Sequence, residues 1–153
     1  MCHFHPLIST RPWGPEKNRQ QLPQVLAEIA SAGYDGVEIG AQHLDITQPD
    51  AFRQLLTRHG LQPVAIHVGG EIYNPQAVQG ALDNLERTVV FAAQAGAMFL
   101  AFSSKAKENK TTEEFQVEAV TANHLPTGTS PASVRRAAPG RTGFLDGNGA
   151  AAG

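Results

Sequence analysis

The 153-residue sequence has little cysteine, no large surplus of charge of either sign and no long apolar run. Its single cysteine, Cys2, cannot form an internal disulfide, which favours a reducing compartment and predicts a cytoplasmic location. Twelve basic residues stand against 14 acidic ones, so no basic surface for nucleic acid is expected. The longest apolar run, residues 95–102, is far shorter than the roughly 20 residues that cross a bilayer. We therefore expect neither nucleic acid nor a membrane as a partner.

Residues 121–153 contain few of the large apolar side chains from which a core is built. They contain seven Ala, six Gly and three Pro, with no Lys and no Glu. Such a segment cannot bury enough surface to offset the entropy lost on ordering. We predict a disordered tail at 121–153 after a folded domain at 1–120. The composition also resembles a reading frame not selected for folding, so one hypothesis is an out-of-frame extension of a truncated gene.

Residues 1–120 alternate between strand-like and helix-like segments. Short apolar runs predict strands at residues 3–8, 36–40, 62–68 and 98–102. Apolar stripes at helical spacing predict helices at residues 22–31, 48–59, 75–95 and 111–120. Apolar strands alternating with helices are typical of a parallel sheet covered by helices, which is an α/β fold.

Two nucleotide-binding folds lose support because their motifs are absent. No Gly-x-Gly-x-x-Gly follows the first predicted strand, and no Walker loop occurs. A (βα)8 TIM barrel remains, but a complete one needs about 250 residues. We therefore predict a partial TIM barrel of about four βα units. Its first and fourth strands would be open edges, so two copies could in principle close an eight-stranded barrel as a homodimer.

Reactive groups of a barrel lie at the carboxyl ends of its strands and in the loops that follow. Glu38 lies within an apolar strand, where a carboxylate either faces a substrate or metal or forms a buried structural ion pair. His67 precedes two glycines and either acts on a ligand or is a hydrogen-bonded core residue. We predict Glu38 and His67 as catalytic residues. Trp13, in the first loop, is either a core residue or an aromatic wall over a small polar ligand.

Other histidines and the residues after the fourth strand are weaker candidates. His3 and His5 would share one face of the first strand, as joint ligation of a metal requires. His43 and His59 are expected to be a solvated loop residue and a helix-end residue. The fourth predicted strand is followed by three further polar candidates, Ser103, Ser104 and Lys105.

Four segments resemble the N-terminal half of the xylose-isomerase-like sugar phosphate isomerase/epimerase family. They are AGYDGVEIG (32–40), HGLQPVAIHVGG (59–70), AAQAGAMFLAFSS (92–104) and KTTEEFQVEA (110–119). The family includes hydroxypyruvate isomerases, inosose dehydratases and ketose 3-epimerases. The resemblance implies a TIM barrel, a small sugar or sugar-derived substrate and a divalent metal (Mn, Mg, Co or Zn). It also implies an acidic site residue at Glu38, a substrate contact at His67 and an aromatic wall at Trp13.

The resemblance stops after residue 119, before the strands that carry the family's metal ligands. We therefore predict no metal ligand in this chain. The expected function is isomerisation or epimerisation of a small hydroxy-carbonyl sugar by proton transfer at a divalent metal, with this truncated chain weakly active or inactive. Two alternatives stay open, a metal-dependent hydrolase that uses His3 and His5 and a non-catalytic fragment. Whether the chain is an enzyme also stays open.

Overall fold

The computed structural model describes residues 6–125. The predictions that concern Cys2, His3, His5 and residues 126–153 lie outside the described residues. The elements follow in the order β1 (Leu7–Ser9), η1 (Arg11–Trp13), α1 (Gly14–Gln20), α2 (Leu22–Ser31), β2 (Gly36–Gly40), η2 (Ala41–His43), α3 (Pro49–Arg58), β3 (Gln62–Gly70), α4 (Val78–Ala95), β4 (Phe99–Ser104) and α5 (Thr112–His124).

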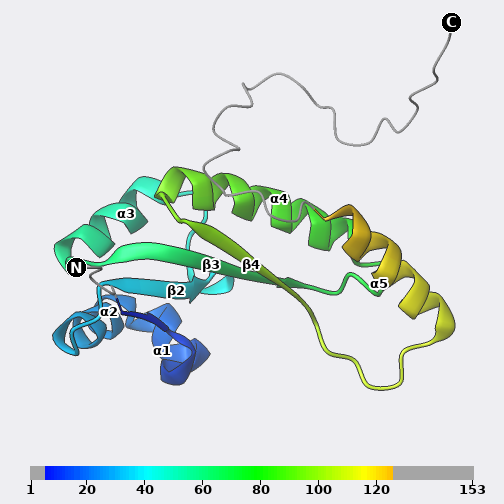
Figure 1. Cartoon of the computed structure of the whole chain (residues 1–153), viewed down its shortest axis with the longest axis horizontal. Coiled ribbons are helices and arrows are strands. Elements are labelled where there is room, and N and C mark those ends of the chain that lie inside the picture. Colours follow the sequence, from blue (N-terminus) through cyan, green and yellow to red (C-terminus); the bar gives the residue numbers. More distant parts are fainter. Residues whose placement is uncertain (1–5, 126–153) are drawn as a thin grey trace, which may run out of the picture.

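The four strands form one parallel sheet in the order β1-β2-β3-β4. Parallel neighbours need a crossover connection, and α2, α3 and α4 lie in those connections. In Figure 1, α3 and α4 lie above the strands and α1 and α2 lie below them. The predicted α/β architecture with a parallel sheet is confirmed. The helix at 22–31 and the strand at 36–40 have the predicted bounds, whereas η1, α1 and η2 were not predicted.

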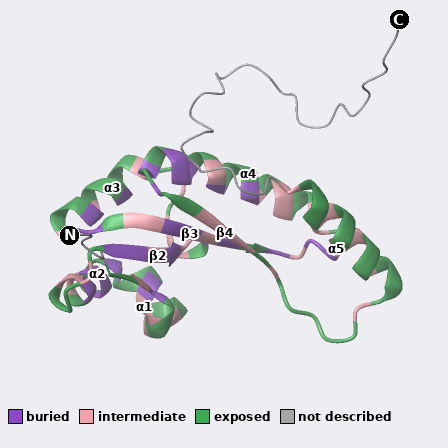
Figure 2. Cartoon of the chain, viewed as in Figure 1, coloured by how far each residue is buried: buried purple, intermediate pink, exposed green. Residues whose placement is uncertain are grey.

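The hydrophobic core lies between one face of the sheet and the helices. The inward side chains of β2 and β3 are at most 2% exposed; they are Val37, Ile39, Ile66 and Val68. They pack with apolar stripes of the helices, in which the buried members are Leu22, Val25, Leu26, Ile29, Phe52, Leu56, Leu85 and Phe91. Figure 2 shows this buried layer along the strands and the inner sides of the helices. The apolar residues that recur every second position in the strands and every third or fourth position in the helices thus pack into one core.

The opposite face of the sheet is covered by none of the described helices. We call it the open face, and its outward side chains include Leu7, Ser9, Glu38, His67, Phe99 and Ser103. Leu7 is 53% exposed and Phe99 is 58% exposed, although both are large apolar residues of strands. The sheet is therefore buried on one side only, which is unusual for parallel strands.

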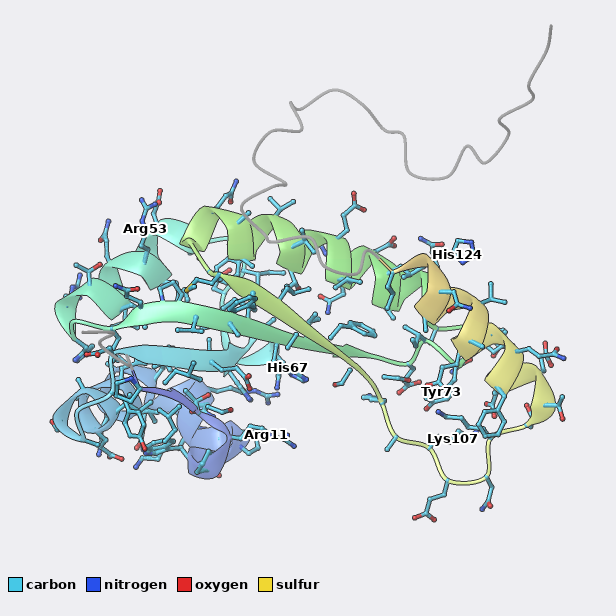
Figure 3. All side chains as sticks on the ribbon, viewed as in Figure 1. Arg11, Arg53, His67, Tyr73, Lys107 and His124 are labelled. Carbon is cyan, nitrogen blue, oxygen red and sulfur yellow. The ribbon has the colours of Figure 1, made fainter. Side chains whose placement is uncertain are left out.

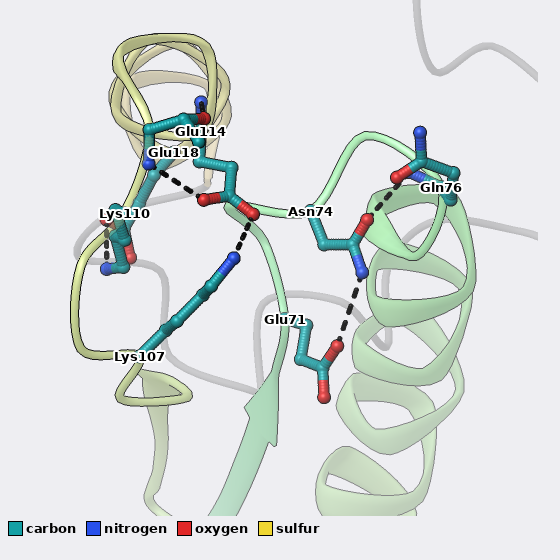
Figure 4. A network of polar contacts seen from close by, with 8 residues as sticks. Glu71, Asn74, Gln76, Lys107, Lys110, Glu114 and Glu118 are labelled. Atoms are coloured by element: carbon teal, nitrogen blue, oxygen red, sulfur yellow. Dashed lines mark hydrogen bonds and ion pairs between the residues drawn. The ribbon is translucent and has the colours of Figure 1, made fainter.

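Helix α5 is linked to the loop before it by polar contacts. Glu114 and Thr111 form a capping box, and Lys107 pairs with Glu114 at 2.5 Å. Lys110 pairs with Glu118 at 2.6 Å, and Figure 4 shows these pairs beside the loop that follows β3. No residue of α5 is buried. The helix ends at His124, so the predicted boundary at residue 120 falls inside it.

A helix that spans a membrane must be both long and apolar. None of the helices within residues 6–125 is both long enough and apolar enough to span a bilayer.

Gly96, at the end of α4, provides a test of backbone conformation alone. Its φ is 84°, and an added Cβ would meet no atom within 4 Å, so strain and not a clash opposes a side chain. We expect Gly96→Ala to lower the free energy of unfolding by about 1 kcal/mol in urea titrations. The control is Gly80→Ala, also without a neighbour within 4 Å but inside α4, which should raise stability by about 0.5 kcal/mol. Equal effects at both positions would contradict the prediction.

Candidate functional site

Four polar side chains share the open face, each from a different strand. Ser9 is in register with Glu38, and Glu38 is in register with Ala65. His67 follows Ala65 by two residues, so it points to the same side of the sheet. Ser103 reaches this side as well, because it is in register with Gly69. The two predicted catalytic residues, Glu38 and His67, therefore lie on the same face of adjacent strands, one alternation apart.

Glu38 is half-buried and is held by the first strand. Its Oε1 accepts a hydrogen bond from Ser9 Oγ at 3.0 Å, and its backbone oxygen accepts one from Thr10 N at 2.9 Å. Within the described chain the carboxylate forms no ion pair, so its partner is a hydroxyl and not a cation. The interpretation as a buried structural ion pair thus finds no support among these residues.

A bulge lies beside Glu38 and explains a glycine of the sequence. The register of β2 and β3 shifts between Val37 and Glu38, which leaves Val64 without a direct partner. A Cβ at Gly36 would come within 2.4 Å of Val64 Cγ2, so only glycine fits without a shift. Bulges re-aim the neighbouring side chains, and this one lies next to the only carboxylate in the described strands.

His67 is half-buried between small neighbours. Its Nε2 lies 2.9 Å from Ser103 Oγ. In register with it stand Gly40 on β2 and Ala101 on β4, but the side chain of Gln42 occupies the place that a Cβ at Gly40 would take. Figure 3 shows His67 projecting from β3, far from Tyr73 and Lys107 near α5. A half-buried histidine with one hydroxyl partner can still bind a small polar ligand.

The polar residues at the end of β4 separate into two groups. Ser103 bonds His67 on the open face, whereas the hydroxyl of Ser104 donates to Glu118 of α5. Lys105 pairs with Glu71 at 3.0 Å. The hydrogen bond from Lys105, followed by that from Asn74, holds the pKa of Glu71 below its usual value. Of the three predicted candidates, only Ser103 joins the site.

Trp13 lies in η1 and contacts the helices. Its indole Nε1 donates to Glu28 Oε2 at 2.6 Å, and its ring packs against the core cluster. Lys17 also pairs with Glu28, at 3.0 Å. The hydrogen bond from Trp13, and after it that from Lys17, lowers the pKa of Glu28. The structure thus does not direct the polar atom of Trp13 to Glu38 or His67, and its substrate-binding role stays a prediction.

Of the two remaining histidines, one lies where it was predicted and the other does not. His59 is the residue at the carboxyl end of α3, as predicted. His43, expected to be a solvated loop residue, instead lies in η2 with a buried Nδ1 that has no hydrogen-bond partner among the described residues. Burial, and to a lesser degree the charge of Arg19, lowers the pKa of His43. The sequence offers no apolar pattern that would have indicated this burial.

The described residues do not fit a divalent metal. Within residues 6–125 no three His, Cys, Asp or Glu side chains come together in a way that could hold a metal ion. Glu38 and His67 supply two donors, whereas a structural or catalytic metal site in a protein generally takes three or more. His3 and His5, the predicted metal pair of the hydrolase alternative, lie outside the described residues.

Comparisons with known proteins bear on the fold. No protein-family model matches the sequence, and no curated protein matches it. A solved structure described as a xylose isomerase-like TIM barrel/4-hydroxyphenylpyruvate dioxygenase fusion protein is similar to this chain, with a TM-score of 0.53 and 21% identity. The fold is a partial TIM barrel. The match covers 79% of this chain and 20% of the solved one, so the chain spans about a fifth of that protein.

The assignment as a partial TIM barrel shows which side of a complete barrel the open face corresponds to. In a TIM barrel the helices lie outside, and the opposite side of the sheet lines the interior. The open face of the partial barrel is therefore the side that would line the interior. Ser9, which was not predicted, belongs to the site because β1 extends to residue 9 and not 8.

The contact between Trp13 and Glu28 can be tested by titration. Trp13→Phe removes the indole N–H, and we expect the pKa of Glu28 to rise toward its usual value in an NMR titration. Because a lowered carboxyl pKa stabilises the folded state only above that pKa, any stability lost in the variant should be evident at neutral pH and vanish in acid. Gln24→Ala, which removes a weaker bond to Glu28, should change this pKa less. An unchanged pKa in Trp13→Phe would refute the contact.

The contact between His67 and Ser103 can be tested by NMR of the imidazole nitrogens. Ser103→Ala removes the hydroxyl partner of Nε2, so we expect the ¹⁵N shift of Nε2 and the ratio of the two neutral tautomers to change. Ser104→Ala is the matched control, because the neighbouring hydroxyl faces Glu118. The same imidazole spectrum in both variants would show that Ser103 does not hold His67.

Proposed function

We propose that this partial barrel is of the sugar isomerase/epimerase type and binds a small hydroxy-carbonyl compound on its open face. One observation carries the proposal. The four described strands contain only two titratable side chains, Glu38 and His67, and both project from adjacent strands to the open face. A strand residue that serves only packing is usually apolar, so a carboxylate and an imidazole placed together indicate acid–base chemistry.

In this proposal Glu38 takes the proton from the carbon beside the carbonyl group. His67 hydrogen-bonds the carbonyl oxygen and passes a proton between the two oxygens of the resulting enediol. Return of the carbon-bound proton to the former carbonyl carbon gives the isomer. For the epimer, a water molecule on the opposite face delivers a proton to the original carbon, and Glu38 passes the first proton to the resulting hydroxide. General acid–base catalysis by positioned side chains contributes about 10²–10⁴-fold in rate.

The observations support different parts of the proposal. The neighbour described as xylose isomerase-like supports the fold, and the sequence resemblance favours a small sugar or sugar-derived substrate. The family's divalent metal is not included in the steps above, because the described residues do not supply its ligands. A chain that holds the proton-transfer pair without those ligands should act slowly.

The proposal is tested by proton exchange, which needs only the first step. The chain is incubated in D₂O with hydroxypyruvate and with several ketoses, and deuterium at the carbon beside the carbonyl is followed by NMR. We expect slow exchange with at least one compound. Glu38→Gln should lower the rate by about 10²-fold or more, since it removes the base. His67→Asn should lower it less. Glu86→Gln, an exposed residue of α4, should leave it unchanged.

Two results would refute this function. One is the absence of protein-dependent exchange with every compound of the panel. The other is exchange that persists equally in Glu38→Gln, which would assign the reaction to another group.

A further inference from the structure

Large and small side chains alternate across the open face. One row in register contains Ser9, Glu38, Ala65 and Phe99, so its large members come from β2 and β4. In the next row His67 of β3 stands between Gly40 and Ala101. In a TIM barrel all the inward side chains of such rows fill the interior, where the strands are staggered along the barrel axis. In both rows the large side chains of the open face are thus separated by small ones on the neighbouring strands.

The two edges of the sheet are complementary. Among residues 6–125, β1 and β4 have no strand on their outer sides. All four strands are parallel, so the outer edge of β4 can be continued by a strand running as β1 does. A second copy rotated about the barrel axis supplies that strand, and its own β4 then meets the first copy's β1. Two such contacts close eight strands and leave no edge.

Because each copy contributes four strands, large and small side chains can alternate around the whole closed barrel. Because four is an even number, the alternation continues across both junctions without two large side chains meeting on neighbouring strands. Glu38 and Phe99 of both copies then face the interior of the closed barrel. His67 of each copy faces the interior as well. Leu7 and Phe99, which are 53% and 58% exposed in one copy, become interior residues.

We propose that a second copy of this chain covers the open face, so that the binding site is completed by the partner's Glu38 and His67. The dimer is expected whether or not these residues act on a hydroxy-carbonyl compound. Its symmetry is cyclic and closed, so assembly stops at two chains. An uncovered parallel sheet with exposed Leu7 and Phe99 is the physical reason for association.

Mass measurement by sedimentation and light scattering tests the closure. Over a wide range of concentration we expect a species of twice the 16.3 kDa of one chain, and nothing larger. Phe99→Glu adds two carboxylates to an interior that already holds the two of Glu38, and it should raise the dissociation constant about tenfold or more. Phe115→Glu is the matched control, because Phe115 is also 58% exposed but lies on α5. The control should remain a dimer.

Hydrogen exchange of the unaltered chain tests the dimer without any substitution, so its result does not depend on whether a variant folds. In the closed dimer the outward amides of β1 and β4 pair with the other copy, so their protection should rise with concentration through the dimer transition. A monomer at all concentrations would overturn the proposal, as would assemblies that keep growing. It would also be overturned by a dimer whose edge amides exchange as fast as those of the monomer. A dimer that survives Phe99→Glu as well as Phe115→Glu would overturn it too.

Discussion

Burial of one face of a parallel sheet beneath α2, α3 and α4 determines the rest of this structure. Val37, Ile39, Ile66 and Val68 lie in that core and are at most 2% exposed. Since side chains alternate along a strand, burying these four turns their neighbours Glu38 and His67 to the other side. The position of the polar pair therefore depends on apolar packing, and a one-residue slip in β2 or β3 would place a carboxylate or an imidazole in the core.

The open face combines two properties that an isolated domain seldom shows together. It carries the only titratable side chains of the described strands, and it also exposes Leu7 and Phe99. In a closed barrel these properties agree, because apolar layers fill the interior and polar groups face a ligand at the carboxyl ends of the strands. Closure would thus hide the apolar residues and surround the polar pair. Binding and assembly are two consequences of the same uncovered surface.

Much of the fold could be predicted from the sequence where periodicity is strong. The stripe Leu22, Val25, Leu26 and Ile29 predicts α2, and the apolar run with a single carboxylate predicts β2. Helix α1 was missed because Asn18 is its only buried residue, so it has no apolar stripe. Glu38 and His67 could be selected because a strand rarely carries a charge without a reason. Their hydroxyl partners could not, since Ser9 and Ser103 are 29 and 36 residues away in the sequence.

The sequence by itself determined the order of strands and helices, the apolar faces and the two polar interruptions at Glu38 and His67, because these depend on local spacing. Only the tertiary structure decided which residues meet. It joined Glu38 to Ser9 and His67 to Ser103, placed Trp13 against Glu28, and buried the Nδ1 of His43. The reason is that register between strands, the bulge at Val37 and the packing of helices on the sheet are set by contacts between distant segments, which no local pattern encodes.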